Sequence, residues 1–161
     1  MQIIEYNEKY LDDVRKLLTE LEEYIVSIDK DNLDHVHSEY YEKMALIDLE
    51  NVRNNNGKCY LALKNDKVVG LIMGIIISYD KYDYLDFKCP KKGEITELVV
   101  TSKFRSNGVG KVLIEKMEKY FKSKGCECVA LDVFAYNDSA INFYEKNGYH
   151  HRMHKEIKKL I

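Results

Sequence analysis

The stretch that decides the fold is EITELVVTSKFRSNGVGKV, residues 94–112. Its first part, residues 94–101, predicts a strand, and an amphipathic helix is expected from Gly108 to about Ser123. Gly108 and Gly110 stand in the turn between them, where the missing Cβ lets a ligand approach the backbone. A helix that begins in such a turn presents unpaired N–H groups and a positive dipole end, so the pattern indicates an anion site.

Two common nucleotide motifs do not fit this turn. A P-loop requires a glycine five residues before Gly110 and a Ser or Thr after Lys111, but the sequence has Arg105 and Val112 there. The dinucleotide motif G-x-G-x-x-G requires a third glycine where Leu113 stands. The anion is therefore not assigned to either kind of nucleotide site.

Composition limits the class of protein. The 161 residues suit one domain, expected to span 1–161, and a net charge of −2 does not favour nucleic acid as a partner. No apolar run is long enough for a membrane span, and the first residues, MQIIEYNEKYLDD, lack the layout of a signal peptide. Four cysteines in such a chain are expected to be reduced, and a cytoplasmic location is expected.

Charge is unevenly distributed along the chain. Residues 1–50 hold 14 Asp and Glu against 5 Lys and Arg, whereas residues 51–161 hold 13 against 20. An acidic first third and a basic remainder suit a protein that binds a cation at one end and an anion at the other. Solvated helix faces would give the same pattern.

Periodicity and turn residues predict a β-α-α start, a hairpin and a β-α-β-α-β end. The loop 79–92, which carries Tyr79, Tyr82, Tyr84 and Phe87, is expected to be exposed with aromatic anchors. The expected strands are 2–6, 59–63, 68–78, 94–101, 128–133 and 149–159, and the expected helices are 8–27, about 40–49, 108–123 and 138–146.

Two motifs carry a resemblance to a known family. The chain from about residue 58 to 159 closely resembles the GNAT superfamily of acetyl-CoA-dependent N-acetyltransferases. The family's Q/R-x-x-G-x-G/A signature is matched by Arg105, Gly108 and Gly110. The family's later N-x-x-A-x-x-F-Y-x-x-x-G-[FY] pattern is matched by Asn137, Ala140, Phe143, Tyr144, Gly148 and Tyr149. The resemblance implies an α/β fold, with a mostly antiparallel central sheet, a splayed pair of fourth and fifth strands, and flanking helices.

The resemblance also implies a cofactor site for acetyl-CoA. Main-chain groups of Leu98, Val99 and Val100, where the strand splays from its neighbour at a bulge, would pair with the pantetheine arm. Asn137 would contact the same arm, although a helix-capping role explains it equally well. The pyrophosphate would be held by the run Arg105, Ser106, Asn107, Gly108, Val109, Gly110 and Lys111.

The amine must be neutral when it attacks, so a base has to take a proton and an acid can protonate the leaving thiolate. Tyr144 matches the tyrosine that many relatives place near the thioester sulfur as the acid. The alternative is that Tyr144 is only an aromatic side chain that packs in the helix. Glu97 is the first candidate for the base, Glu94 on the same strand is the second, and Asp132 on the next strand is the third. For each carboxylate, a structural or solvated role is an equal alternative.

The acceptor is expected between residues 20–40 and 79–92, which form the acceptor side in relatives. The first segment is acidic and rich in tyrosine, which favours a cationic amine such as a polyamine or an aminoglycoside-like molecule. A lysine or N-terminal amine of a protein, or a non-catalytic acyl-CoA-binding module, are the alternatives. Because dimers are common in this superfamily, a homodimer is expected as well.

No metal is expected. The pair Cys126 and Cys128 lacks the C-x₂-C spacing of a zinc site, and both are predicted to be core residues of a buried strand.

Overall fold

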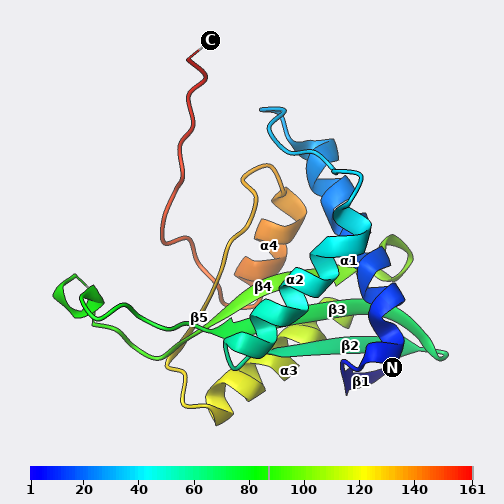
Figure 1. Cartoon of the computed structure of the whole chain (residues 1–161), viewed down its shortest axis with the longest axis horizontal. Coiled ribbons are helices and arrows are strands. Elements are labelled where there is room, and N and C mark those ends of the chain that lie inside the picture. The colour runs from blue at the N-terminus through cyan, green and yellow to red at the C-terminus, as the bar shows by residue number, and fades with distance from the viewer. Residues whose placement is uncertain (87, 161) are drawn as a thin grey trace.

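The computed structural model describes residues 1–86 and 88–160. The chain folds into a five-stranded sheet with helices on both faces (Figure 1). The strands are β1 (Gln2–Glu5), β2 (Lys58–Lys64), β3 (Lys67–Ile76), β4 (Lys92–Val100) and β5 (Cys128–Leu131). The α-helices are α1 (Leu11–Ile28), α2 (Tyr40–Asn54), α3 (Val109–Ser123) and α4 (Asp138–Lys146).

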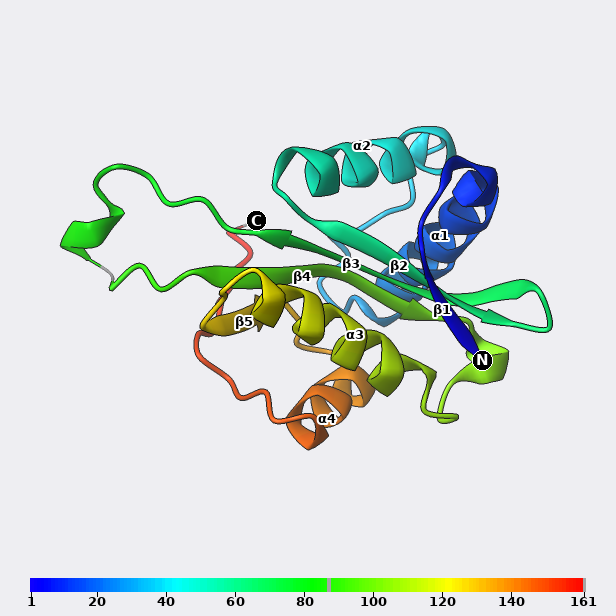
Figure 2. The same ribbon diagram turned by 90° about the horizontal axis from the view of Figure 1, so that it is seen from below.

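The strands follow one another across the sheet in chain order. Neighbours run antiparallel from β1 to β4, and β5 runs parallel to β4 after the α3 crossover. Helices α1 and α2 cover one face, and α3 covers the other, with α4 beyond it (Figure 2). The predicted α/β class with a mostly antiparallel sheet is therefore confirmed.

Each face of the sheet has its own hydrophobic core. Val14, Leu17 and Leu18, spaced to form one stripe of α1, pack on Leu71 and other residues of one face. Leu113, Met117 and Phe121 of α3 pack on Ile72 and Ile95 of the other face. The helical spacing that predicts α1 and α3 is thus the spacing that covers the sheet.

The predicted splay of β4 and β5 is present. The two strands pair only from Lys92 with Cys128 to Ile95 with Leu131, and β4 then continues to Val100 without β5. A bulge in β4 follows at once, because Met73 faces Glu97 and Gly74 faces Ile95, which leaves Thr96 without a partner on β3.

The strand predicted over residues 149–159 is wrong. Residues 149–160 contain no strand and leave the body as an extended, mostly exposed tail (Figure 1). Met153 is 81% exposed and Leu160 is 86% exposed. The many charged side chains of the tail leave too few apolar ones to bury a strand face.

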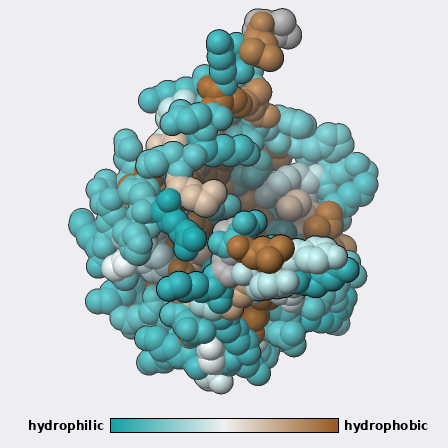
Figure 3. Space-filling model, turned by 90° about the vertical axis from the view of Figure 1, so that its left-hand side faces the viewer, coloured by the Kyte–Doolittle hydropathy of each residue, from teal (hydrophilic) through white to brown (hydrophobic). Residues whose placement is uncertain are grey.

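Residues 77–86 and 88–91 form an arm that projects beyond the sheet between β3 and β4 (Figure 2). Tyr79 closes its base by donating to the carbonyl of Pro90 at 3.0 Å. Tyr82 and Tyr84 are too exposed to act as buried anchors, and the ring of Tyr82 lies under Lys81 of the same segment. Phe87 lies outside the described residues. From the arm's side the molecule is mostly hydrophilic, with scattered hydrophobic groups (Figure 3).

Candidate active site

A pocket of about 190 Å³ lies where β4 and β5 part. Helix α1 forms one wall with Glu22 and Ile25, and the bulged part of β4 forms the next. The segment after β5 and the start of α4 close it, with Asn137 and Tyr144. Of the two segments expected on the acceptor side, 20–40 contributes to this pocket, whereas no described residue of 79–92 lines it.

The bulge at Thr96 decides which carboxylates share a face. Ile95 packs in the core under α3, whereas Val99 packs in the core under α1 and α2, although the two residues are four apart. In a regular strand they would point to the same face. The extra residue reverses the alternation, so Glu94 and Glu97, which pair with Ile75 and Met73 of the α1–α2 core, both point to the α1–α2 face.

Of the three predicted bases, Glu97 and Asp132 line the pocket and Glu94 does not. Glu97 is half-buried, and Asp132 is exposed just after β5. Burial raises the pKa of Glu97 to about 8, and the charges of Asp48 and Glu22 add to the shift. A carboxyl group poised near neutrality in a pocket is what proton transfer requires.

Helices α1 and α2 surround Glu97 with acidic and phenolic groups. Burial raises the pKa of Asp48 to about 6, and one of its carboxylate oxygens is buried without a hydrogen-bond partner among the described residues. The pKa of Glu22 is raised by burial and then by Asp34. The pKa of Tyr40 is raised by burial and by Glu22, Glu97 and Asp48. The charges of Asp48 and Glu22 both act on Glu97, and these three residues are called the acidic cluster below.

Tyr144 reaches the same pocket from α4. Its ring contacts Phe143 and Tyr149, with centroids 5.4 and 5.7 Å away. Burial raises the pKa of its hydroxyl to about 12, and the charge of Glu97 contributes. Tyr144 is thus at once a packed aromatic and a protonated hydroxyl beside Glu97, so its two predicted roles are compatible.

The predicted phosphate loop leads into the N-terminus of α3. Gly108 is its N-cap with a φ of +77°, a left-handed conformation that favours glycine, and a Cβ there would meet nothing within 4 Å. The loop residues Arg105, Ser106 and Asn107 are exposed. The N–H groups of the first turn of α3 have no partner within the helix, which is the geometry that suits an anion.

Gly110 has a different reason to be glycine. A Cβ at this position would lie 3.1 Å from the ring of Phe143 on α4. This contact with Phe143 is a reason for glycine that involves no ligand. The residue lets α3 and α4 pack closely.

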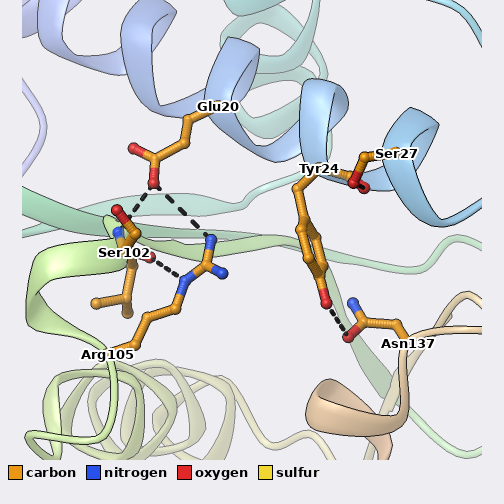
Figure 4. Close-up of polar contacts among 7 residues, drawn as sticks. Glu20, Tyr24, Ser27, Ser102, Arg105 and Asn137 are labelled. Atoms are coloured by element: carbon orange, nitrogen blue, oxygen red, sulfur yellow. Dashed lines mark hydrogen bonds and ion pairs between the residues drawn. The ribbon is translucent and has the colours of Figure 1, made fainter.

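Asn137 caps α4, because its Oδ1 accepts from the N–H of Ala140 at 3.1 Å. The same atom accepts from the hydroxyl of Tyr24 on α1 at 3.4 Å. On the other side of the splay, Glu20 of α1 accepts from the N–H of Ser102 at 2.9 Å and lies 3.8 Å from the guanidinium of Arg105 (Figure 4).

Four residues near the pocket and the splay were not predicted individually from the sequence: Glu20, Tyr24, Tyr40 and Asp48. Glu20 and Tyr24 stand one helical turn apart in the segment assigned to the acceptor side, so a shared face was a signal that could have marked them. Asp48 carried no such signal, because its position depends on how α2 lies on the sheet.

The described residues contain no group of three or more His, Cys, Asp and Glu side chains that could hold a metal ion. Cys126 is partly buried and Cys128 is exposed at the sheet edge, so the prediction that both are core residues is wrong. Cys128 is the first residue of β5, a short strand that is paired on one side, which leaves this side chain in solvent. Cys126 precedes the strand and packs against the core under α3. None of the described helices is long and apolar enough to span a membrane.

Residues 14–149 match the Acetyltransferase (GNAT) family, and the chain belongs to that family. The resemblance drawn from the two motifs is thereby confirmed.

Human N-alpha-acetyltransferase 30 is 32% identical over 91 residues, which are 56% of this chain and 23% of that protein. The chain thus spans about a quarter of the length of this curated relative. A mutant of the BH1408 protein from Bacillus halodurans shares the fold with a TM-score of 0.86, at 18% identity and with both chains fully covered. The aminoglycoside N-acetyltransferase AAC(6')-Iy in complex with CoA has a TM-score of 0.68, at 18% identity and with 98% of this chain and 99% of that chain covered.

Proposed function

We propose that the chain, acting as one domain over residues 1–161, transfers an acetyl group from acetyl-CoA to a primary amine of a cationic small molecule. The observation that carries the proposal is the pocket at the splay. It brings a carboxyl group with a pKa of about 8 beside a protonated tyrosine hydroxyl. Both groups stand next to a strand with a free edge.

The residues present fit coenzyme A. The first turn of α3 and the open space at Gly108 suit a pyrophosphate, with Arg105 to Lys111 as its contacts. Beyond Ile95, the outer edge of β4 has no strand beside it, so the main-chain groups of Leu98 and Val100 that point to this edge suit an extended arm. Val99 between them directs its main-chain groups to β3, and the Val100 carbonyl also accepts from Arg105. Asn137 uses its Oδ1 for the cap and for Tyr24, so its NH₂ group is the donor that we assign to that arm.

When bound, the cofactor supplies an acetyl group activated as a thioester. The protein's part is to bring the amine to the pocket and to manage two protons. Glu97 in its ionised form accepts the proton that a cationic amine must lose, directly or through a water molecule. Tyr144 keeps its hydroxyl proton at neutral pH because its pKa is near 12, so it is the donor that we assign to the leaving group.

The acidic cluster of Glu22, Asp48 and Glu97 supports a cationic acceptor. These groups repel one another at a site that is partly removed from water, and an ammonium group would relieve that repulsion. None of the three forms an ion pair with a described residue of the chain. The similarity to an aminoglycoside N-acetyltransferase agrees with a small-molecule amine.

A second candidate is acetylation of a peptide or protein amine. It is favoured by the 32% identity to N-alpha-acetyltransferase 30 and by the open position of Asp132 at the pocket rim. Release of CoA from acetyl-CoA, measured across polyamines, aminoglycosides and peptides with free N-termini, separates the two. Turnover with peptides alone would overturn the small-molecule proposal. Tight CoA binding without turnover of any amine would indicate a non-catalytic binding module.

A further inference from the structure

Helix α1 touches both walls of the proposed cofactor slot (Figure 4). Glu20 reaches the wall formed by the end of β4 and the following loop, where its Oε1 meets the N–H of Ser102 and the guanidinium of Arg105. Tyr24 reaches the opposite wall at the N-cap of α4, where its hydroxyl donates to Asn137. The two side chains are one helical turn apart, so they project from the same face of α1.

The ring of Tyr24 also contacts Arg105, so this one side chain reaches both walls. The guanidinium carbon of Arg105 lies 5.1 Å from the centre of this ring, within cation–π distance. Tyr24 therefore extends from Arg105 on one wall to Asn137 on the other. The slot between the walls is bridged from the α1 side by a single aromatic side chain.

Arg105 is held at a defined place on its wall. Its Nε–H donates to the carbonyl of Val100 at 3.0 Å. Thr101 directs its own N–H to Val69 on β3 at 3.0 Å, and successive residues of a strand point their peptide groups to opposite edges. The carbonyl of Val100 therefore points into the splay, and Arg105 covers it there.

We propose that Glu20 and Tyr24 are positioning residues for coenzyme A, which brace the two walls of the slot. In this arrangement, called the α1 brace, Glu20 fixes the Arg105 side chain and the start of the phosphate loop before the cofactor binds. Tyr24 sets the separation of the loop from the cap of α4. The inference rests on the proposed function, because it assigns the slot to coenzyme A.

The α1 brace is not expected to act by stabilising the folded protein. The Glu20 and Arg105 side chains are 34% and 42% exposed, and exposed ion pairs add little to folding. Their effect is to restrict where the guanidinium and the Ser102 N–H can lie. A loop that is already in place binds with less loss of conformational freedom.

The first test uses the protein without cofactor. Hydrogen exchange of the Ser102 amide should become faster in Glu20→Ala, because its acceptor is removed. In Glu20→Gln the amide oxygen can still accept this bond, so exchange should stay slow while the charge on Arg105 loses its partner. The matched control is Glu23→Gln, which removes a charge from an exposed position of the same helix. Unchanged Ser102 exchange in Glu20→Ala would overturn the brace.

The second test is calorimetric binding of coenzyme A and of pantetheine, which lacks the pyrophosphate. Glu20→Ala should lose about tenfold or more in affinity for coenzyme A, the usual scale for a hydrogen bond to a charged group, and much less for pantetheine. With Arg105→Gln as background, Glu20→Gln should have little further effect. Tyr24→Leu should weaken binding more than Tyr24→Phe, which keeps the ring over Arg105.

The outcomes separate the two proposals. If the wild type binds no coenzyme A, the proposed function falls and the positioning role falls with it. If the wild type binds and Glu20→Ala binds equally well, or loses affinity equally for pantetheine, only the α1 brace is refuted.

Discussion

The raised pKa of Glu97 makes a prediction about stability as well as activity. A glutamate released into the unfolded chain titrates near 4.5, whereas in the folded protein Glu97 titrates near 8. Between these pH values the folded state holds a proton that the unfolded state has lost. The free energy of unfolding must therefore fall as pH rises through this window. Glu97→Gln, which has no proton to lose, should remove that part of the slope.

The window from pH 6 to pH 8 isolates this group. Asp48, whose folded pKa is about 6, contributes mainly below the window. With 1.36 kcal/mol for each pKa unit, Glu97 should cost the wild type about 2 kcal/mol of unfolding free energy between pH 6 and pH 8. Urea slopes of about 1–3 kcal/mol per molar turn this into a midpoint shift on the order of 1 M.

The assay is urea unfolding of the cofactor-free protein at several pH values. The midpoint of the wild type should fall from pH 6 to pH 8, whereas that of Glu97→Gln should stay nearly level and become the higher of the two. Glu94→Gln is the control, because it removes a carboxylate from the same strand and leaves the acidic cluster in place. Parallel pH dependence in the wild type and Glu97→Gln would refute the assignment of the buried, neutralised carboxyl group to Glu97.

Further predictions concern catalysis and the loop. Tyr144→Phe should keep the aromatic packing and lower kcat by about 10²–10⁴-fold, with little change in CoA affinity measured by calorimetry; an unchanged kcat would make the hydroxyl structural. Glu97→Gln should lower kcat/KM most near neutral pH, and its deficit should narrow at high pH, where the amine is already neutral; a pH-independent loss would indicate positioning instead. Gly108→Ala should weaken CoA binding because its methyl group fills the open space, and it should also cost some stability because of its φ of +77°. Gly110→Val should cost about 1–3 kcal/mol of stability against Phe143 in thermal unfolding, with less effect on CoA binding; a larger loss of CoA affinity in Gly110→Val than in Gly108→Ala would contradict the distinction. The KM of a cationic amine should rise with salt, since screening weakens its attraction to the acidic residues, and a salt-independent KM would argue against a charge-selected acceptor.

Local patterns in the sequence were enough for much of the fold. The spacing of apolar residues predicts α1 and α3, because one stripe of each helix has to cover the sheet. The turn at Gly108 predicts a helix start with an anion site, and Asn137 predicts the cap of α4, because both effects involve residues within one turn. The two motifs that indicate the GNAT family are local in the same sense.

The tertiary structure decided the rest. Whether residues 149–160 form a strand depends on a partner across space, and the sequence could not show that they lie apart from the sheet. The reason for glycine at position 110 lies on α4, 33 residues away in the chain, where Phe143 stands. The bulge at Thr96 is the clearest case, because one unpaired residue places Glu97 on the face that α1 and α2 cover. There, burial raises the pKa of Glu97, and the charges of Asp48 and Glu22 add to the shift. Both effects depend on distances between separate elements and on the exclusion of water, which sequence spacing does not determine.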